Sequence, residues 1–317
     1  MSSTTIPTNT TVPVAGAELT DGTKRKVRDM AGCFIKRKAA KEKERYTVGE
    51  VVCMAVVALL FCVVAFPVFY ALAQSFRTYS EITIDPMGLP TRISFDNYAR
   101  LFQDTAFPQA TLNTVIITVT TLLILVVILP MAAYGIERIG GRSSRALYLL
   151  FLAGLMIPFQ VRMIPIVKTF NTIGLYSTLT SVILVHLGGA AGFGILLYCS
   201  FIKGVPVEVE EAAEVDGAGK LRTFWQVVFP MLMPVTSAFV ITNSLSFWND
   251  YFIPLVMLDS SSAGTINVAI NRMMGLLTSQ WELIYAGAIL SLIPSVIIFA
   301  AFQRYFIKGM AVGAVKG

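Results

Sequence analysis

The sequence predicts an all-α polytopic membrane protein with six transmembrane helices and both termini in the cytoplasm. Of its 317 residues, 55% are hydrophobic and only 14% are charged, and the mean hydropathy is +0.70. One soluble core cannot bury that much apolar surface, so the surrounding solvent is expected to be lipid. Long charge-free runs and an uneven placement of Lys and Arg complete the prediction.

The charge-free runs locate the membrane spans. A helix needs roughly 20 predominantly apolar residues to cross a bilayer core, and five charge-free runs reach that length. A sixth run, from Ala146 to Val161, is shorter. We therefore assign residues 46–317 to one transmembrane domain, with spans at about 51–74, 112–135, 146–167, 178–201, 231–253 and 283–303.

The shorter third span carries signals of a break. Arg162 can lie near the outer interface, because its long side chain carries the charged head to water at modest cost. Pro158 and Pro165 predict a kinked or broken helix here, since proline removes a backbone donor and clashes with the preceding turn. Such a break is tolerated where neighbouring helices or a water-lined cavity satisfy the freed carbonyl groups.

The placement of Lys and Arg predicts the orientation. Ten of the 25 Lys and Arg residues precede residue 46, and most of the others follow the second, fourth and sixth spans. Because cytoplasmic loops carry an excess of these residues, both ends of the chain and the loop at 203–230 are expected in the cytoplasm. The residues expected outside are Arg77, Arg92, Arg100, Arg162, Lys168 and Arg272.

The first 45 residues differ in composition from the rest of the chain. Residues 1–23 are rich in Ser, Thr, Pro and Gly, which cannot bury enough apolar surface to order a chain, so we predict disorder. Residues 24–45 are strongly basic and would act as the positive flank that fixes the topology. A helix that rests on anionic lipid is the alternative.

The loop between the fourth and fifth spans carries the most informative local signals. Pro206 suits a first helical position, and Glu208, Glu210 and Glu211 place negative charge near the positive end of the helix dipole. Gly217 can supply the turn that ends this helix. The sequence therefore predicts a short helix, a tight bend and a second short helix. The acidic helix suits docking into another protein, although a hairpin that merely connects two spans would carry similar signals.

The same loop resembles a known family. From Glu211 to Pro230, the loop has glutamate, small, glycine, apolar and proline residues at fixed distances from one another. This pattern resembles the one that marks the permease subunits of binding-protein-dependent ABC importers. Val227 replaces the usual Ile and Phe229 the usual Leu, and both changes keep the position apolar. The residues that match this spacing are Glu211, Ala212, Ala213, Gly217, Val227, Phe229 and Pro230.

Other segments narrow the resemblance to the carbohydrate branch and, within it, to the maltose-type second permease subunit. The resemblance covers roughly residues 48 to 317. The segments that carry it are Asp216-Gly217-Ala218, Trp248-Asn249-Asp250, Gln303-Arg304-Tyr305-Phe306 and Gly313-Ala314-Val315-Lys316-Gly317.

The resemblance implies a subunit of an ATP-driven importer for a sugar or oligosaccharide, in the cytoplasmic (inner) membrane of a prokaryote. The implied partners are a second homologous permease, two ATPase subunits that bind ATP-Mg, and an extracytoplasmic sugar-binding protein. The implied coupling residues are Glu211, Ala212, Ala213, Asp216, Gly217 and Pro230. The implied ATPase-contacting tail includes Gly313, Ala314, Lys316 and Gly317, for which a frayed chain end is the alternative.

Polar residues within the spans are the candidates for the substrate path: Gln160, His186, Asn243, Trp248 and Asn249. Sugars are bound by aromatic stacking and by amide hydrogen bonds, which suits Trp248 with Asn249. An interfacial aromatic at a helix end would explain the same pair. His186 adjoins a glycine-rich stretch and would serve equally as an interhelical hydrogen-bond partner beside closely packed small residues. In the resembling family, the partner permease can hold most of the substrate.

The sequence does not predict an enzyme or a bound cofactor. Gly219-Lys220 resembles part of a phosphate-binding loop, but Glu214 replaces its first glycine and Leu221 its Ser or Thr. One histidine and cysteines that lie mostly within spans do not suit zinc binding or nucleophilic catalysis.

Three alternatives to a sugar importer remain. One is an ABC permease for another solute, such as a polyol or glycerol phosphate. Another is an ion-coupled secondary transporter, which would need intramembrane carboxylates that the predicted spans lack away from their ends. The last is a membrane anchor for a cytoplasmic complex, which would not need polar and proline-broken spans.

Overall fold

The computed structural model describes residues 47–103, 105–275 and 279–314. The chain divides into two compact units, Met1–Ala65 and Phe66–Gly317. The part of helix α2 (Val48–Gln74) that belongs to the first unit is apolar and almost entirely exposed. Its length and composition suit a membrane span. The tail predicted over residues 1–45 lies outside the described residues.

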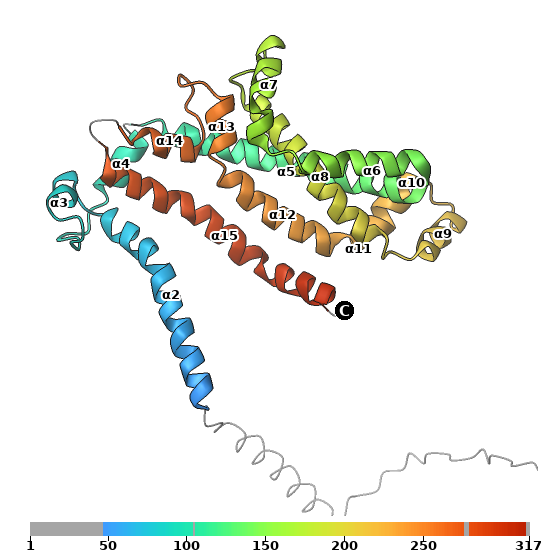
Figure 1. The fold of residues 1–317 in the computed structure, drawn as a ribbon, viewed down its shortest axis with the longest axis horizontal. Coiled ribbons are helices and arrows are strands. Elements are labelled where there is room, and N and C mark those ends of the chain that lie inside the picture. The colour runs from blue at the N-terminus through green and yellow to red at the C-terminus, as the bar shows by residue number, and fades with distance from the viewer. Residues whose placement is uncertain (1–46, 104, 276–278, 315–317) are drawn as a thin grey trace, which may run out of the picture. The chain divides into compact units, whose positions relative to one another are not determined.

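The second unit is a bundle of long helices with short helices at both ends (Figure 1). Helix α15 packs against α12, α12 against α5, and α5 against α8, which also packs against α6. The described residues form helices and one isolated antiparallel β-bridge, between Met274 and Ser279, but no β-strand. This confirms the predicted all-α class. The long helices are α5 (Phe107–Ile139), α6 (Gly141–Leu155), α8 (Leu179–Ile202), α12 (Met233–Trp248) and α15 (Trp281–Ala314).

The short helices define the two ends of this bundle. Helices α3 (Tyr79–Ile84), α4 (Asp96–Gln103) and α14 (Ile266–Arg272) gather at one end, the α4 end (Figure 1). Helices α9 (Val207–Val215) and α10 (Lys220–Thr223) lie at the opposite end, the α9 end (Figure 1). The acidic loop is therefore far from the segments predicted to lie outside the membrane.

Two of the long apolar segments are bent. Helix α6 and helix α7 (Phe159–Thr172) meet at 102°, and the segment Lys220–Met231 meets α12 at 72°. Pro158 is the N-cap of α7 at the first bend, whereas Pro165 lies inside α7 without ending it. Among the described residues, four helices are long and apolar enough to cross a membrane, or up to six if each bent pair forms one span.

Close contact between helices depends on two glycines of α8. A Cβ atom on Gly192 would lie 2.6 Å from the carbonyl oxygen of Phe151 in α6, and one on Gly194 would collide with Leu129 of α5. A Cβ atom on Gly189 would meet open space. The small-residue packing offered for this stretch is therefore confirmed at Gly192 and Gly194, where bare backbone lets the helices approach.

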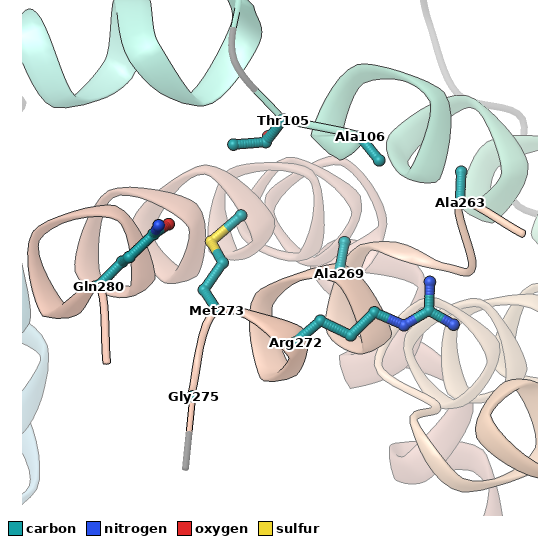
Figure 2. Close-up of a pocket in the computed structure, with 8 residues that line it drawn as sticks. All are labelled: Thr105, Ala106, Ala263, Ala269, Arg272, Met273, Gly275 and Gln280. Atoms are coloured by element: carbon teal, nitrogen blue, oxygen red, sulfur yellow. The ribbon is translucent and has the colours of Figure 1, made fainter. Parts of the chain in front are cut away.

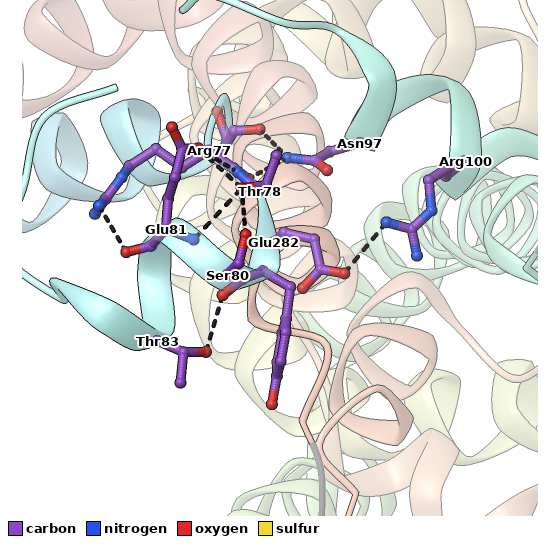
Figure 3. A network of polar contacts seen from close by, with 10 residues as sticks. Arg77, Thr78, Ser80, Glu81, Thr83, Asn97, Arg100 and Glu282 are labelled. Carbon is purple, nitrogen blue, oxygen red and sulfur yellow. Dashed lines mark hydrogen bonds and ion pairs between the residues drawn. The ribbon is translucent and has the colours of Figure 1, made fainter. Parts of the chain in front are cut away.

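A buried arginine organises the α4 end (Figure 3). The Arg77 guanidinium donates to Gln74 Oε1 and to the Asp85 carbonyl oxygen, both at 2.8 Å. The Asn97 amide, from α4, donates to the carbonyl oxygens of Ser75 and Arg77 at 2.8 Å. Arg77 is only 4% exposed, so this charge, which the sequence suggested was simply external, holds the end of α2 to the segment around α3, while Asn97 fixes the same segment to α4.

An ion pair joins α4 to the start of α15 (Figure 3). Arg100 Nη1 lies 3.3 Å from Glu282 Oε1, and Glu282 is buried whereas Arg100 is half exposed. The contact links residues that are 182 positions apart in the sequence. The α4 end is thus tied to the last long helix by a charge pair.

Replacement of Gly192 by Ala is expected to lower the midpoint of thermal unfolding in detergent, because the new methyl group meets a backbone oxygen. Overpacking costs typically about 1–3 kcal/mol, which exceeds the gain of roughly 1 kcal/mol from removing a helical glycine. Gly189→Ala is the matched control and should keep or raise the midpoint. Equal midpoints for the two variants would contradict the packing described for α6 and α8.

Candidate functional site

The loop between α8 and α12 forms a helix, a turn and a second helix, as predicted. Helix α9 is followed by Gly217, whose φ of +83° lies in the left-handed region, where glycine avoids the strain of a side chain. The Gly217 N–H donates to the Glu214 carbonyl oxygen at 3.0 Å, and the Ala218 N–H donates to that of Ala213 at 2.9 Å. This paired arrangement satisfies the last carbonyls of the helix and confirms the turn predicted at Gly217.

The start of α9 differs slightly from the prediction. Pro206 is the N-cap residue, and the helix begins at Val207. The fixed φ of proline still suits this position, because the missing N–H would have no partner inside the helix.

One face of α9 and its turn is exposed. Ala213 is half-buried. Pro230 lies separately, exposed within helix α11 (Phe229–Met231), beyond the π-helical turn η1 (Phe224–Val228). The predicted coupling residues on the exposed face are Glu211, Ala212, Asp216 and Gly217.

The opposite face of α9 is anchored by Glu210, a role that the sequence analysis missed. The Tyr134 hydroxyl group donates to Glu210 Oε2 at 2.8 Å. Arg138 donates from Nε to Glu210 Oε1 at 2.8 Å, and its Nη2 lies 2.7 Å from the same oxygen. The sequence suggested only a helix-dipole role for Glu210, and no local pattern links residues 72 positions apart.

His186 belongs to α8 and faces the end of α12. Its ring centroid is 4.7 Å from that of Phe247, and its Nε2 is 3.5 Å from Asp250 Oδ2. Neither of these two polar atoms has a hydrogen-bond partner within the described residues. Because His186 is only 4% exposed, its ring faces protein in this conformation.

The other substrate-path candidates lie in different environments. Trp248 is buried, and its Nε1 donates to the Ser291 carbonyl oxygen of α15 at 2.9 Å. Asn243 is buried and donates to the Phe239 carbonyl oxygen. Gln160 on α7 and Asn249 after α12 are exposed. A role in the substrate path therefore stays a prediction, and in this conformation the exposed amides are the accessible candidates.

A hollow of about 250 Å³ at the α4 end is lined mainly by small and apolar groups (Figure 2). Arg272 projects along it and donates to the carbonyl oxygens of Ser262 and Asp259. Hydrogen bonds from Ser261 lower the pKa of the Asp259 carboxyl group below its ordinary value. The hollow is small, and its principal cation is already used by protein carbonyl groups.

Comparison with known proteins decides the family. Residues 126–312 match the family described as "Binding-protein-dependent transport system inner membrane component". The chain belongs to this family. The matched region contains the whole of α9, its turn and Pro230. It therefore includes the loop whose residues carried the resemblance in the sequence.

Curated relatives are similar to this permease over most of their length. MsmG of Streptococcus mutans, a "Multiple sugar-binding transport system permease protein", is 35% identical over 79% of this chain and 91% of the relative. AmyC of Thermoanaerobacterium thermosulfurigenes, a "Probable starch degradation products transport system permease protein", is 32% identical over 79% and 91%. MelC of Bacillus subtilis, a "Melibiose/raffinose/stachyose import permease protein", is 30% identical over 83% and 97%.

Solved structures share the fold of this permease. A chain from the crystal structure of a bacterial ABC transporter involved in the import of the acidic polysaccharide alginate matches with a TM-score of 0.73 and 22% identity. The match covers 82% of this permease and 99% of that chain. At this level of identity, the likeness establishes the fold alone.

Replacement of Gly217 by Val is expected to loosen the end of α9, because a β-branched residue is strained at positive φ. A strain of roughly 1–2 kcal/mol should accelerate amide hydrogen exchange in residues 213–218 by about tenfold. Gly219→Val is the matched control, since Gly219 is extended at φ −71° with open space around it. Unchanged exchange in Gly217→Val would show that the turn does not hold the helix end.

Proposed function

We propose that this permease forms half of the translocation pathway of an ATP-driven importer for a sugar or oligosaccharide, and that α9 couples it to the ATPase subunits. The observation that carries the proposal is an acidic helix held at one end of the bundle by Glu210, with Glu211 exposed on its outer side. A helix that is anchored on one face and exposed on the other can bind a partner on its exposed face and be displaced when that partner moves.

The proposed substrate class rests on the relatives. MsmG, AmyC and MelC are named for multiple sugars, for starch degradation products and for melibiose, raffinose and stachyose, respectively. Each is similar to this permease over three quarters or more of both chains. A different solute, such as a polyol or glycerol phosphate, remains the alternative, because GgtD of Synechocystis, an "Osmoprotective compounds uptake permease protein", is 30% identical over 71% of this chain.

The proposed orientation places the α9 end in the cytoplasm of a prokaryotic cell, with the chain in the inner membrane. Exposed Arg142, Lys203, Lys220 and Arg222 flank the helices at this end, as the excess of cations in cytoplasmic loops requires. If each bent helix pair is one span, the chain crosses six times and both termini are cytoplasmic. The α4 end then faces outward, toward the extracytoplasmic sugar-binding protein.

A second, homologous permease is supported by the bend between α6 and α7. Non-helical backbone is tolerated at membrane depth only where protein covers it or water fills a cavity beside it. Met156 and Ile157 at this bend are exposed, Met156 by 82%. A second permease would cover the bend and enclose a water-lined path for the solute.

Two ATPase subunits complete the proposed transporter and carry the ATP-Mg. Closure of the ATPase pair around ATP would displace α9 and shift the bundle between inward-open and outward-open states. The tail residues Gly313 and Ala314 belong to the backbone of α15, and Lys316 and Gly317 lie outside the described residues. Contact between this tail and the ATPase pair stays part of the proposal.

Glu211→Lys is expected to abolish co-purification of the ATPase from mild detergent while leaving the yield of the permease unchanged. The reason is that Glu211 is exposed, so reversal of its charge alters the docking face without disturbing the bundle. The measurement is a pull-down of the tagged chain, co-expressed with its partners, followed by identification of the ATPase and second permease.

The control for this experiment makes the same charge change at the other end of the bundle. Asp96→Lys, at the start of α4, also replaces an exposed acid and should keep the ATPase bound. Loss of the ATPase in both variants, or in neither, would contradict the role of α9. Uptake of radiolabelled raffinose, maltotriose and glycerol 3-phosphate by the intact transporter then separates a sugar importer from the alternative.

A further inference from the structure

A single guanidinium group joins three segments at the α9 end. Besides its two contacts with Glu210, Arg138 Nη2 donates to the carbonyl oxygens of Val205 at 2.9 Å and Ile202 at 3.3 Å. Arg138 belongs to the last turn of α5, Ile202 ends α8, and Val205 leads into α9. With Tyr134, these residues form what we call the Arg138 knot.

The knot has the properties of a rigid joint. The Glu210 side chain is 7% exposed and that of Arg138 is 21% exposed, so water screens the ion pair weakly. The planar guanidinium directs its donors at fixed angles, which a lysine ammonium group cannot reproduce. Tyr134 occupies the second carboxylate oxygen. Glu210 is therefore held through both of its oxygens and cannot swing without breaking several hydrogen bonds.

The other connection of α9 to the bundle relies on packing, since η1 lies against α9 and its buried Phe224 ring has its centroid 5.2 Å from that of Tyr134. After α9 the chain turns at Gly217 with φ +83°, and it bends by 72° between Lys220–Met231 and α12. No described salt bridge links α10 to another helix. In contrast, the α5–α8 junction has a second ion pair, in which Lys203 Nζ lies 3.6 Å from Glu137 Oε1. The described ion pairs at this end therefore connect α9 to α5 and α5 to α8, and none of them involves α12.

We infer that Arg138 and Glu210 are positioning residues that make α9 a rigid extension of α5 and α8, so that displacement of α9 enters the bundle through α5 rather than through α12. The mechanical part of this inference concerns the chain alone. Its consequence for transport rests on the proposed function, in which an ATPase displaces α9.

The rigid attachment of α9 to α5 can be tested on the full chain in lipid nanodiscs without any partner protein. Spin labels are placed at Leu123 on α5 and Val215 at the end of α9, both exposed, in a cysteine-free background. Pulsed electron resonance should give one narrow distance distribution for the unmodified knot. Glu210→Gln should broaden it, because one of the two accepting oxygens becomes an NH2 donor and the charge that strengthens the bonds from Arg138 is lost.

Two further variants keep this test decisive. Glu208→Gln is the matched control, since Glu208 is an exposed acid on the same helix, and it should leave the distribution narrow. Arg138→Met with Glu210→Met removes the knot but leaves no unpaired buried charge, so it should fold even if Glu210→Gln does not. A narrow, unshifted distribution in this double variant would overturn the inference.

The consequence for transport is measured in the reconstituted importer. In Glu210→Gln, ATPase docking and hydrolysis should persist, because the Glu211 face is intact, while uptake falls and the ATP hydrolysed per solute imported rises by roughly tenfold. Loss of uptake and hydrolysis in equal proportion would indicate a purely structural role and contradict the inference. If the unaltered chain binds no ATPase, the proposed function fails, and the spin-label result still decides the inference about the knot.

Discussion

The structure depends on one constraint: a backbone N–H or C=O group that faces lipid must find its hydrogen-bond partner within the protein. Continuous helices meet this requirement in α5, α8 and α15. The two bends interrupt it, and prolines, which lack the N–H donor, lie beside both. In the proposed transporter, the second permease covers the exposed bend between α6 and α7. The constraint thus explains both the helical class of this permease and the sites at which it is incomplete.

Several buried or partly buried charged and polar side chains also find partners within the protein. Arg77, Glu282 and Asp250 lie at or near helix ends, and each contacts an opposite charge or backbone groups. The Arg138 knot is the most heavily bonded example, because one guanidinium satisfies a carboxylate and two carbonyl oxygens. Removal of one partner from such a buried pair leaves a charge without compensation, which is strongly unfavourable. These contacts therefore specify how the helix ends meet.

Neighbouring residues of α9 face in different directions and have different roles. Successive side chains on a helix point about 100° apart, so Glu210 can face the bundle while Glu211 faces outward. The inward carboxylate fixes the position of the helix, and the outward one remains free for a partner. Gly217 ends the helix with its carbonyls satisfied. The acidic run thus combines an anchor with the surface proposed for docking, and of these two roles the sequence suggested only the docking.

Composition and local spacing are enough to predict the all-α membrane class, the helix and turn around Gly217, the break near Pro158 and the family. The pairing of Arg138 with Glu210, the burial of Arg77 and the packing of Trp248 against α15 are visible only in the folded chain. Those contacts join residues far apart in the chain, and helix geometry fixes only which residues share a face. Which faces meet depends on the packing of the whole bundle, including the close approach at Gly192 and Gly194.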